Sequence, residues 1–539
     1  MNLYDVIIRN GTVYDGLGGD PFVADVALTG DTIAEIGPNL AGMADLEIDA
    51  AGLAVAPGFI NMLSWAVESL LHDGRSQSDI RQGVTLEVMG EAFSFGPITD
   101  EMAAKEGGLM GNNHDYYYDV PWRSLREYLD HLVERGVSCN VTSFIGTHTL
   151  RRYVMGADDR PPTAEELEKM CQLVRQAMAE GAVGMSAALV YPPAAFAKTD
   201  ELIALCKVVA EFDGVYISHL RSEGDSFLEA LDEFLTILRE ANVRGEIYHL
   251  KAAGHTNWHK MDEAIKKIEA AQAEGLDVTA DMYLYPAGGT GLKSIVPLWA
   301  HDGGNEALIK RLKHPVTRGQ IKQEMDVVSK DWENFWAATR SPADILISQI
   351  VDPDLKHLIG KSIQEIADLR GTTPKDAALD LLIEDNCGTM AIYFMMSEEN
   401  IEKQIKLPWV SFDSDAGSVA PEGAFLKSNP HPRTYGNFAR LLGKYVRDRQ
   451  VIPLQEAVRK LTSFPAAVLK LKDRGQLAAG FKGDVVVFDP ETIADHATFA
   501  YTHQYATGVR DVFVNGTIVL QDGEHTDARP GQVVVLGQS

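Results

Sequence analysis

The stretches Val215-Tyr-Ile-Ser-His219 and Glu246-Ile-Tyr-His249 are two short runs rich in β-forming residues, and each ends in a histidine. Longer amphipathic helical patterns separate runs of this kind, and the alternation extends from Leu53 to about Ala467. Such alternation is typical of βα units around a parallel sheet. The sequence therefore predicts an α/β protein with a (β/α)₈ TIM-like barrel, and a length of 539 residues leaves room for attached domains.

Nine segments of this region are candidate barrel strands, although the barrel has only eight places. One segment, or the boundary between two, must therefore be misassigned. The segments are Val55–Leu63, Val84–Gly90, Asn140–Ile145, Gly184–Val190, Val215–His219, Glu246–His249, Val278–Tyr283, Met390–Phe394 and Trp409–Asp413. Among the helices between them, Thr163–Gly181 begins with a capping-box pattern, since Glu166 follows Thr163 by three positions.

Both ends of the chain have a different pattern. The first 50 or so residues and the stretch from about Arg474 alternate apolar and polar positions between turn residues, which indicates short antiparallel strands. We therefore predict a small β-sandwich domain built from residues 1–54 and 468–539, around a catalytic barrel of residues 55–467. Residues from about 288 to 347 interrupt the barrel rhythm with a largely helical insertion, expected to form a lid or small subdomain over the active-site face.

Composition narrows the classes of partner. The formal net charge is −28, from 77 acidic and 49 basic residues, and such a field repels nucleic acid and anionic membranes. The four cysteines are scattered, which favours reduced thiols over a disulfide framework or a thiolate zinc site. The chain opens with a strand-like run and not with a secretory signal, so we expect a cytoplasmic protein. The expected partner is a small molecule, with neither nucleic acid nor membrane, and a homo-oligomer is compatible with the sequence.

Four polar residues fall where predicted barrel strands end, and strand ends of this kind point into a catalytic mouth. They are Glu91, His219, His249 and Asp415. Two imidazoles and a carboxylate, with one position left open, are typical of a catalytic zinc site, and a second carboxylate is then available to move protons. A histidine at a strand end is equally compatible with a hydrogen-bonded core residue, so the pattern alone leaves both interpretations open.

Several motifs resemble known proteins in their order along the chain. Val55-Ala-Pro-Gly-Phe-Ile-Asn61 and the segment 474–489 resemble the first strand of the amidohydrolase superfamily and its return to the β domain. Five further segments resemble the D-aminoacylase (N-acyl-D-amino-acid deacylase) family: Ile217–Asp225, Tyr248–Gly254, Ala280–Gly288, Ser414–Gly417 and Pro430–Arg433. The resemblance runs from Val6 to about Gly531, which is nearly the whole chain.

This resemblance implies a metal-dependent hydrolase that cleaves the amide bond of N-acyl-D-amino acids. His219 and His249 match the family's two histidines on the tightly bound metal, and Asp415 matches its catalytic aspartate. Four positions match residues that contact substrate: Lys251, Tyr283 and Arg433 at the carboxylate, and Tyr191 near the scissile carbonyl. A structural salt bridge for Lys251 or Arg433, and core packing for the tyrosines, are the alternative interpretations.

The sequence departs from the family at two places. The family's first strand ends in His-X-His, whereas this chain has Leu63-Ser64-Trp65. The family's bridging cysteine is replaced in the stretch Gly90-Glu91-Ala92, where Glu91 can supply an oxygen ligand. We therefore expect one divalent ion, with zinc favoured, held by Glu91, His219 and His249; a plain ion pair of Glu91 is the alternative. Hydrolysis of another amide (a dipeptide, cyclic or aryl amide) and a non-catalytic barrel are the alternative functions.

Overall fold

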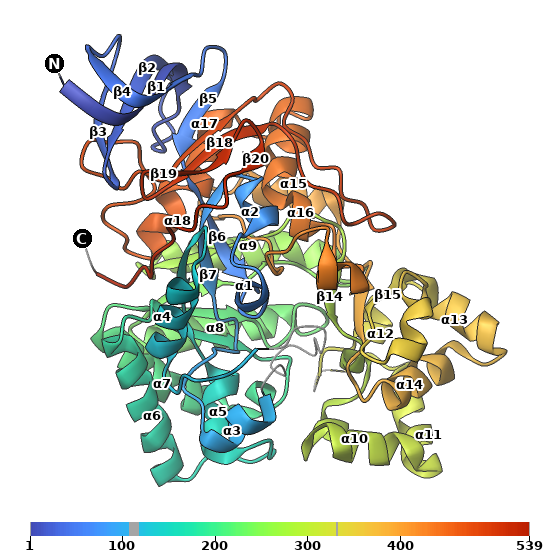
Figure 1. The fold of residues 1–539 in the computed structure, drawn as a ribbon. Coiled ribbons are helices and arrows are strands. Elements are labelled where there is room, and N and C mark those ends of the chain that lie inside the picture. Colours follow the sequence, from blue (N-terminus) through green and yellow to red (C-terminus); the bar gives the residue numbers. More distant parts are fainter. Residues whose placement is uncertain (1, 107–117, 330–331, 538–539) are drawn as a thin grey trace.

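The computed structural model describes residues 2–106, 118–329 and 332–537 of the chain. It is a mixed α/β protein whose two ends share one nine-stranded sheet (Figure 1). Ala56 of β5 lies opposite Val486 of β17 in an antiparallel pair that joins the two ends. No helix in these ranges is long and apolar enough to cross a membrane. The strands of this sheet are β1 (Asn2–Val13), β2 (Phe22–Thr29), β3 (Thr32–Gly37), β4 (Gly42–Asp49), β5 (Ala54–Pro57), β17 (Val485–Phe488), β18 (Val509–Val514), β19 (Thr517–Gln521) and β20 (Glu524–His525).

A second set of strands runs in parallel and begins directly after β5. Pairing joins the first three, β6, β7 and β8, and it joins β9 to β13 in sequence order. The N–H of Val183 donates to the carbonyl of Ser143 and links the two groups. Parallel bridges between Ala280 and Val410 and between Ser64 and Ala416 return the series to β6. The strands are β6 (Phe59–Ser64), β7 (Val84–Met89), β8 (Asn140–Ser143), β9 (Ile145–Gly146), β10 (Gly184–Ala188), β11 (Val215–His219), β12 (Arg244–Ile247) and β13 (Val278–Ala280).

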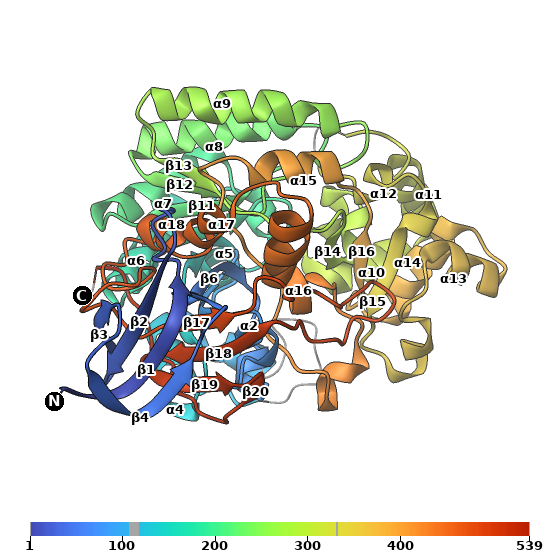
Figure 2. The same cartoon turned by 90° about the horizontal axis from the view of Figure 1, so that it is seen from above.

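Amphipathic helices alternate with these strands along the chain, and Figure 2 shows two of them, α8 (Phe227–Ala241) and α9 (Met261–Ala273), side by side along β12 and β13. One face of α8 is buried at helical spacing, with Leu231 and Leu238 among its core residues. The predicted start of α6 (Ala164–Ala179) is confirmed, because Thr163 and Glu166 form a reciprocal capping box.

The strand β16 (Met390–Tyr393) corrects the list of candidate strands. It pairs antiparallel with β14 (Gly288–Gly291) and β15 (Ile345–Gln349), so the candidate Met390–Phe394 does not belong to the parallel series. The candidate Val55–Leu63 is also divided, between β5 of the terminal sheet and β6 of the parallel set. Both misassigned segments are apolar and β-forming, so their composition does not tell in which sheet they lie. That depends on which strands they pair with in the folded protein.

The segment from β14 to Met396 forms a lobe with its own apolar core (Figure 1). The lobe contains the antiparallel sheet β14-β16-β15, so it continues past the helical insertion seen in the sequence. Its helices include α10 (Gly304–Lys313), α11 (Pro315–Glu324), α12 (Phe335–Ala338), α13 (Ile363–Arg370) and α14 (Pro374–Glu384).

A tight turn after β7 depends on a close backbone approach. Gly90 has a φ of 103° and Ala92 a φ of 53°. The N–H of Ala92 donates to Ser186 Oγ at 3.0 Å, and the carbonyl of Ala92 accepts from His148 N at 3.0 Å. A Cβ placed on Gly146 would lie only 1.9 Å from that carbonyl oxygen. Only glycine therefore allows β9 to pack against this turn.

We predict that Gly146→Ala destabilises the protein by about 1–3 kcal/mol, because the added methyl group must displace the turn. Thermal unfolding measures the loss. The control is Gly319→Ala in α11, where the added Cβ has no neighbour within 4 Å, so stability should be unchanged or slightly higher. Equal unfolding temperatures for the Gly146→Ala variant and the parent would contradict the packing argument.

Candidate metal centre

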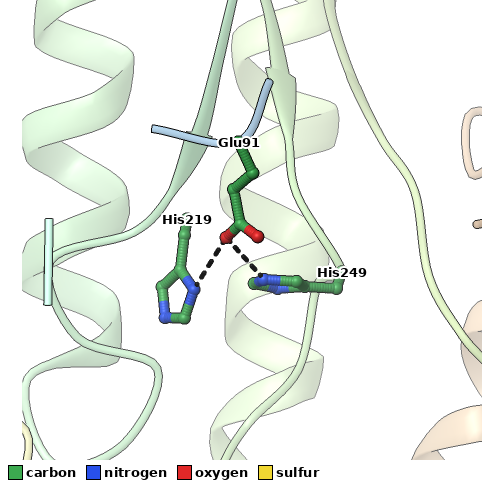
Figure 3. Close-up of side chains that lie close together, drawn as sticks. All are labelled: Glu91, His219 and His249. Carbon is green, nitrogen blue, oxygen red and sulfur yellow. Dashed lines mark hydrogen bonds and ion pairs between the residues drawn. The ribbon is translucent and has the colours of Figure 1, made fainter. Parts of the chain in front are cut away.

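Three side chains from the ends of three parallel strands converge at one point (Figure 3), and two of these strands, β11 and β12, are neighbours. Glu91 follows β7, His219 ends β11 and His249 follows β12. Glu91 Oε1 lies 3.3 Å from His219 Nδ1 and 3.3 Å from His249 Nε2. The two imidazole planes are nearly perpendicular, at 88°, with ring centroids 4.5 Å apart. The structure thus brings together the three residues that the sequence analysis selected as metal ligands.

The donor atoms of this group fit a divalent metal ion. One ligand atom from each of Glu91, His219 and His249 lies within 4.8 Å of the other two, and all three residues are buried. Two nitrogens and one carboxylate oxygen are a common set of protein ligands for a catalytic metal with one open position. Burial favours a raised pKa for Glu91, but hydrogen bonds from both imidazoles outweigh it and hold the pKa below its ordinary value. The carboxylate is therefore ionised and able to bind a cation.

The backbone turns sharply at two of the selected residues. His249 has a φ of 33° and Asp415 a φ of 43°, in the left-handed region that non-glycine residues rarely adopt. The N–H of His249 donates to the Asp281 carboxylate, and the N–H of Asp415 donates to the Leu63 carbonyl at 3.0 Å. These bonds hold both residues in conformations of a kind that clusters at functional sites.

Asp415 lies beside the three ligands and shares a hydrogen-bond donor with one of them. Trp65 Nε1 donates to Glu91 Oε2 at 3.0 Å and to Asp415 Oδ1 at 3.1 Å. Arg433 Nη1 lies 2.8 Å from Asp415 Oδ2. Burial raises the pKa of Asp415 above its ordinary value, although the Arg433 guanidinium opposes that shift. A carboxyl group with a raised pKa accepts a proton more readily than an ordinary aspartate and can return it.

The residues expected to contact substrate lie around the same centre. The Arg433 guanidinium lies 4.3 Å from the centroid of the Tyr283 ring, and Lys251 Nζ lies 5.6 Å from it. The Tyr191 ring meets His219 edge to face at 5.4 Å. All eight residues selected from the sequence line one cavity of about 1090 Å³.

Two residues that contact this centre were not predicted from the sequence. Trp65 stands in the segment that replaces the family's His-X-His, and its indole N–H donates to two carboxylates. Glu223 lies beside both imidazoles, on the side away from Glu91, and accepts from Lys251 Nζ at 2.6 Å. Glu223 lies within the segment 217–225 that carries the family resemblance, four positions after His219. The presence of a carboxylate four positions after His219 is the feature of the sequence that could have identified Glu223.

Known proteins are similar to this chain along nearly its whole length. The amidohydrolase family model matches residues 426–520. The chain is 33% identical to a D-aminoacylase of Alcaligenes xylosoxydans xylosoxydans, over 98% of this chain and 97% of that protein. It is 31% identical to an N-acyl-D-glutamate deacylase of the same organism, over 98% and 96%. The Bordetella bronchiseptica N-acyl-D-glutamate deacylase, solved with zinc and a phosphonate inhibitor, is 28% identical with a TM-score of 0.82, over 99% of this chain and 100% of that one.

The parallel strands, the buried ligand group and these similarities define an amidohydrolase, a hydrolase of the metal-dependent class. Within that class, the chain belongs to the D-aminoacylase family, as its 33% identity to a member along nearly its whole length shows.

We predict that Glu91→Ala loses bound divalent metal, because two imidazoles alone hold a cation too weakly. Glu91→Cys supplies a thiolate and should retain more metal than the alanine variant. Elemental analysis after dialysis measures both. The control is Glu233→Ala, which removes a carboxylate that lines the same cavity but pairs with Arg221. Full metal content in Glu91→Ala would show that Glu91 is not a ligand.

Proposed function

We propose that this protein hydrolyses the amide bond of N-acyl-D-amino acids, releasing a carboxylate and a free D-amino acid. The observation that carries the proposal is the buried Glu91/His219/His249 group beside Asp415 in one cavity. Relatives along nearly the whole chain support the substrate class, since those 30–33% identical are named D-aminoacylase, N-acyl-D-glutamate deacylase and N-acyl-D-aspartate deacylase.

Asp415 is the residue we assign to proton transfer. A divalent ion, when bound, lowers the pKa of water and polarises a carbonyl oxygen. The Asp415 carboxylate accepts the proton of the attacking water and delivers it to the leaving nitrogen, because an unprotonated amide nitrogen is a poor leaving group. Arg433 and the Trp65 N–H hold the two Asp415 oxygens in place for this exchange. The Tyr191 hydroxyl is our candidate donor to the developing oxyanion.

We assign the substrate's α-carboxylate to the cations near Tyr283. Arg433 and Lys251 both lie near the face of that ring, where they can fix the orientation of a bound anion. Each cation already has a carboxylate partner, Asp415 for Arg433 and Glu223 for Lys251. A substrate carboxylate would therefore bind Arg433 and Lys251 while these cations also remain paired with Asp415 and Glu223.

We propose one ion per chain and favour zinc. The position of the family's first-strand histidines holds Leu63 and Trp65, and neither side chain offers a lone pair to a cation. The Trp65 N–H is directed at Glu91 and Asp415, so the indole occupies the space between two carboxylates that a second ion would need.

We also propose that the parallel series is a closed (β/α)₈ barrel, the domain predicted for residues 55–467, with β5 left to the terminal sheet and with the predicted insertion of about 288–347. The predicted segments 1–54 and 468–539, together with the rest of β5, then form the β-sandwich domain. The return of the pairing from residue 416 to β6 supports closure. The four cysteines are unpaired, which favours a cytoplasmic protein. Its partner is a small-molecule substrate.

A hydrolysis screen on protein of known metal content tests the function. N-acetyl-D-amino acids should be cleaved at least tenfold faster than their L-enantiomers, and the matching N-acetyl-D-amino-acid amides, which lack the carboxylate, should be poor substrates. Turnover of dipeptides, cyclic amides or aryl amides in preference to all N-acyl amino acids would replace the proposed substrate class. Absence of any hydrolysis by metal-loaded protein would favour a non-catalytic barrel.

For Asp415→Asn we predict a loss of turnover of about 10²–10⁴-fold, because an amide cannot carry the proton. Metal content and unfolding temperature should stay close to those of the parent, since Asp415 is not in the ligand group. Initial rates and elemental analysis on one preparation measure both. Turnover within a few-fold of the parent would contradict the assignment.

A further inference from the structure

We propose that Asn61 is a positioning residue for Asp415, because its side-chain amide holds the residue that directly precedes Asp415. The inference rests on the proposed function, in which Asp415 transfers the proton. Asn61 lies in β6 and is fully buried. Its Oδ1 accepts from the backbone N–H of Ser414 at 2.9 Å, and its Nδ2 donates to Ser414 Oγ at 2.8 Å. Both polar groups of the amide therefore contact the neighbour of Asp415.

The backbone at Ser414 requires an acceptor from a side chain. In a regular strand, successive N–H groups point to opposite neighbouring strands, so one neighbour pairs with every second residue. The N–H groups of Ser414 and Asp415 are consecutive, yet both point to β6, where they donate to the Asn61 side chain and to the Leu63 carbonyl. The Asn61 amide thus supplies an acceptor that regular strand pairing does not offer.

This contact fixes the backbone from which the Asp415 side chain extends. Asp415 has a φ of 43°, so the chain turns sharply directly after Ser414. In this conformation Asp415 Oδ1 accepts from Trp65 Nε1 at 3.1 Å, and Oδ2 lies 2.8 Å from Arg433 Nη1. Displacement of Ser414 would move the carboxylate away from both partners. A misplacement of about 1 Å at a reacting group can cost about 10²-fold in rate.

The neighbouring Asp79 explains why this residue is an amide and not a carboxylate. Asn61 Nδ2 also donates to Asp79 Oδ1 at 3.2 Å, and Asp79 is buried. An ionised carboxylate at position 61 has no N–H to donate. It would also lie beside a second buried carboxyl group, and like charges in such a place repel each other strongly. Only the amide can accept from Ser414 and donate to Asp79 at the same time.

The indole N–H of Trp65 reports the position of Asp415 without any substrate. The chain has seven tryptophans, and Trp65→Phe assigns the ¹H–¹⁵N indole resonance of Trp65 in protein labelled with ¹⁵N-tryptophan. We expect Asn61→Asp to shift this resonance, because the variant loses the donor to Asp79 and displaces Ser414, and Asp415 moves with it. An unchanged resonance in the folded variant would overturn the proposal.

Asn140→Asp is the matched control. Asn140 is also fully buried, and its Nδ2 donates to Asp484 Oδ2 at 3.3 Å. It begins β8, whereas the metal ligands lie at the other ends of the parallel strands. The control makes the same chemical change beside a carboxylate, so the unfolding temperature should fall while the Trp65 resonance stays in place. An equal shift in both variants would mean that lost stability moves Trp65, and the proposal would be wrong.

Turnover of an N-acetyl-D-amino acid per bound metal ion tests the consequence for catalysis. Asn61→Asp should lose about 10–100-fold, and the Asn140→Asp control should lose none. Asn61→Asp together with Asp79→Asn exchanges the amide and the carboxylate, which restores an N–H between the two side chains. We expect this double variant to recover most of the turnover and the parental Trp65 resonance. A double variant as impaired as Asn61→Asp alone would contradict the proposal.

Asn61→Ser introduces no charge and covers the case in which Asn61→Asp does not fold. Its shorter side chain cannot reach the N–H of Ser414, so the Trp65 resonance should shift here too, and an unchanged resonance would refute the proposal. Because this signal needs no substrate, the two proposals fail separately. The role of Asn61 can be refuted while N-acyl-D-amino acids are cleaved. If none is cleaved, the proposed function fails while the contact that holds Asp415 stands.

Discussion

The burial of the Glu91 carboxylate is the constraint on which the centre depends. Removing an ionised group from water costs several kcal/mol unless nearby groups compensate. Here the compensation comes from His219 and His249, each 3.3 Å away, and from the Trp65 N–H at 3.0 Å. The strands β7, β11 and β12 must therefore end at the same level. The turn after β7 must also hold the Glu91 side chain next to the two histidines. The close packing of β9 against that turn serves this requirement.

Trp65 extends the same constraint to the catalytic side of the cavity. Its single N–H is shared between Glu91 and Asp415, so these two carboxylates are held at a fixed separation. Where the family carries a metal-binding histidine, this chain has a hydrogen-bond donor to two anions. A hydrogen-bond donor at this position lowers the electrostatic repulsion between the Glu91 and Asp415 carboxylates. Without it, a second cation would be needed to offset that repulsion.

The residues at strand ends could be identified from the sequence. The alternation of strand and helix patterns shows where each parallel strand ends, and side chains at those ends face the active-site side of the sheet. Glu91, His219 and His249 were found in this way and lie together in the structure. Glu223 was missed because it follows a strand by four residues, where no periodicity shows which way a side chain points. Met390–Phe394 was assigned to the wrong sheet, since a short apolar run has the same composition in a parallel and an antiparallel sheet.

The charges of the cavity bear on the substrate. Of the charged residues that line the cavity, those at the centre are Glu91, Glu223 and Asp415, with three negative charges, and Lys251 and Arg433, with two positive ones. When neutral imidazoles hold a divalent ion, these charges sum to one net positive charge. A metal-loaded centre of this charge would attract an anion. A substrate with a single carboxylate neutralises the loaded centre, so an N-acyl amino acid with an uncharged side chain matches it more closely than an amide without a carboxylate.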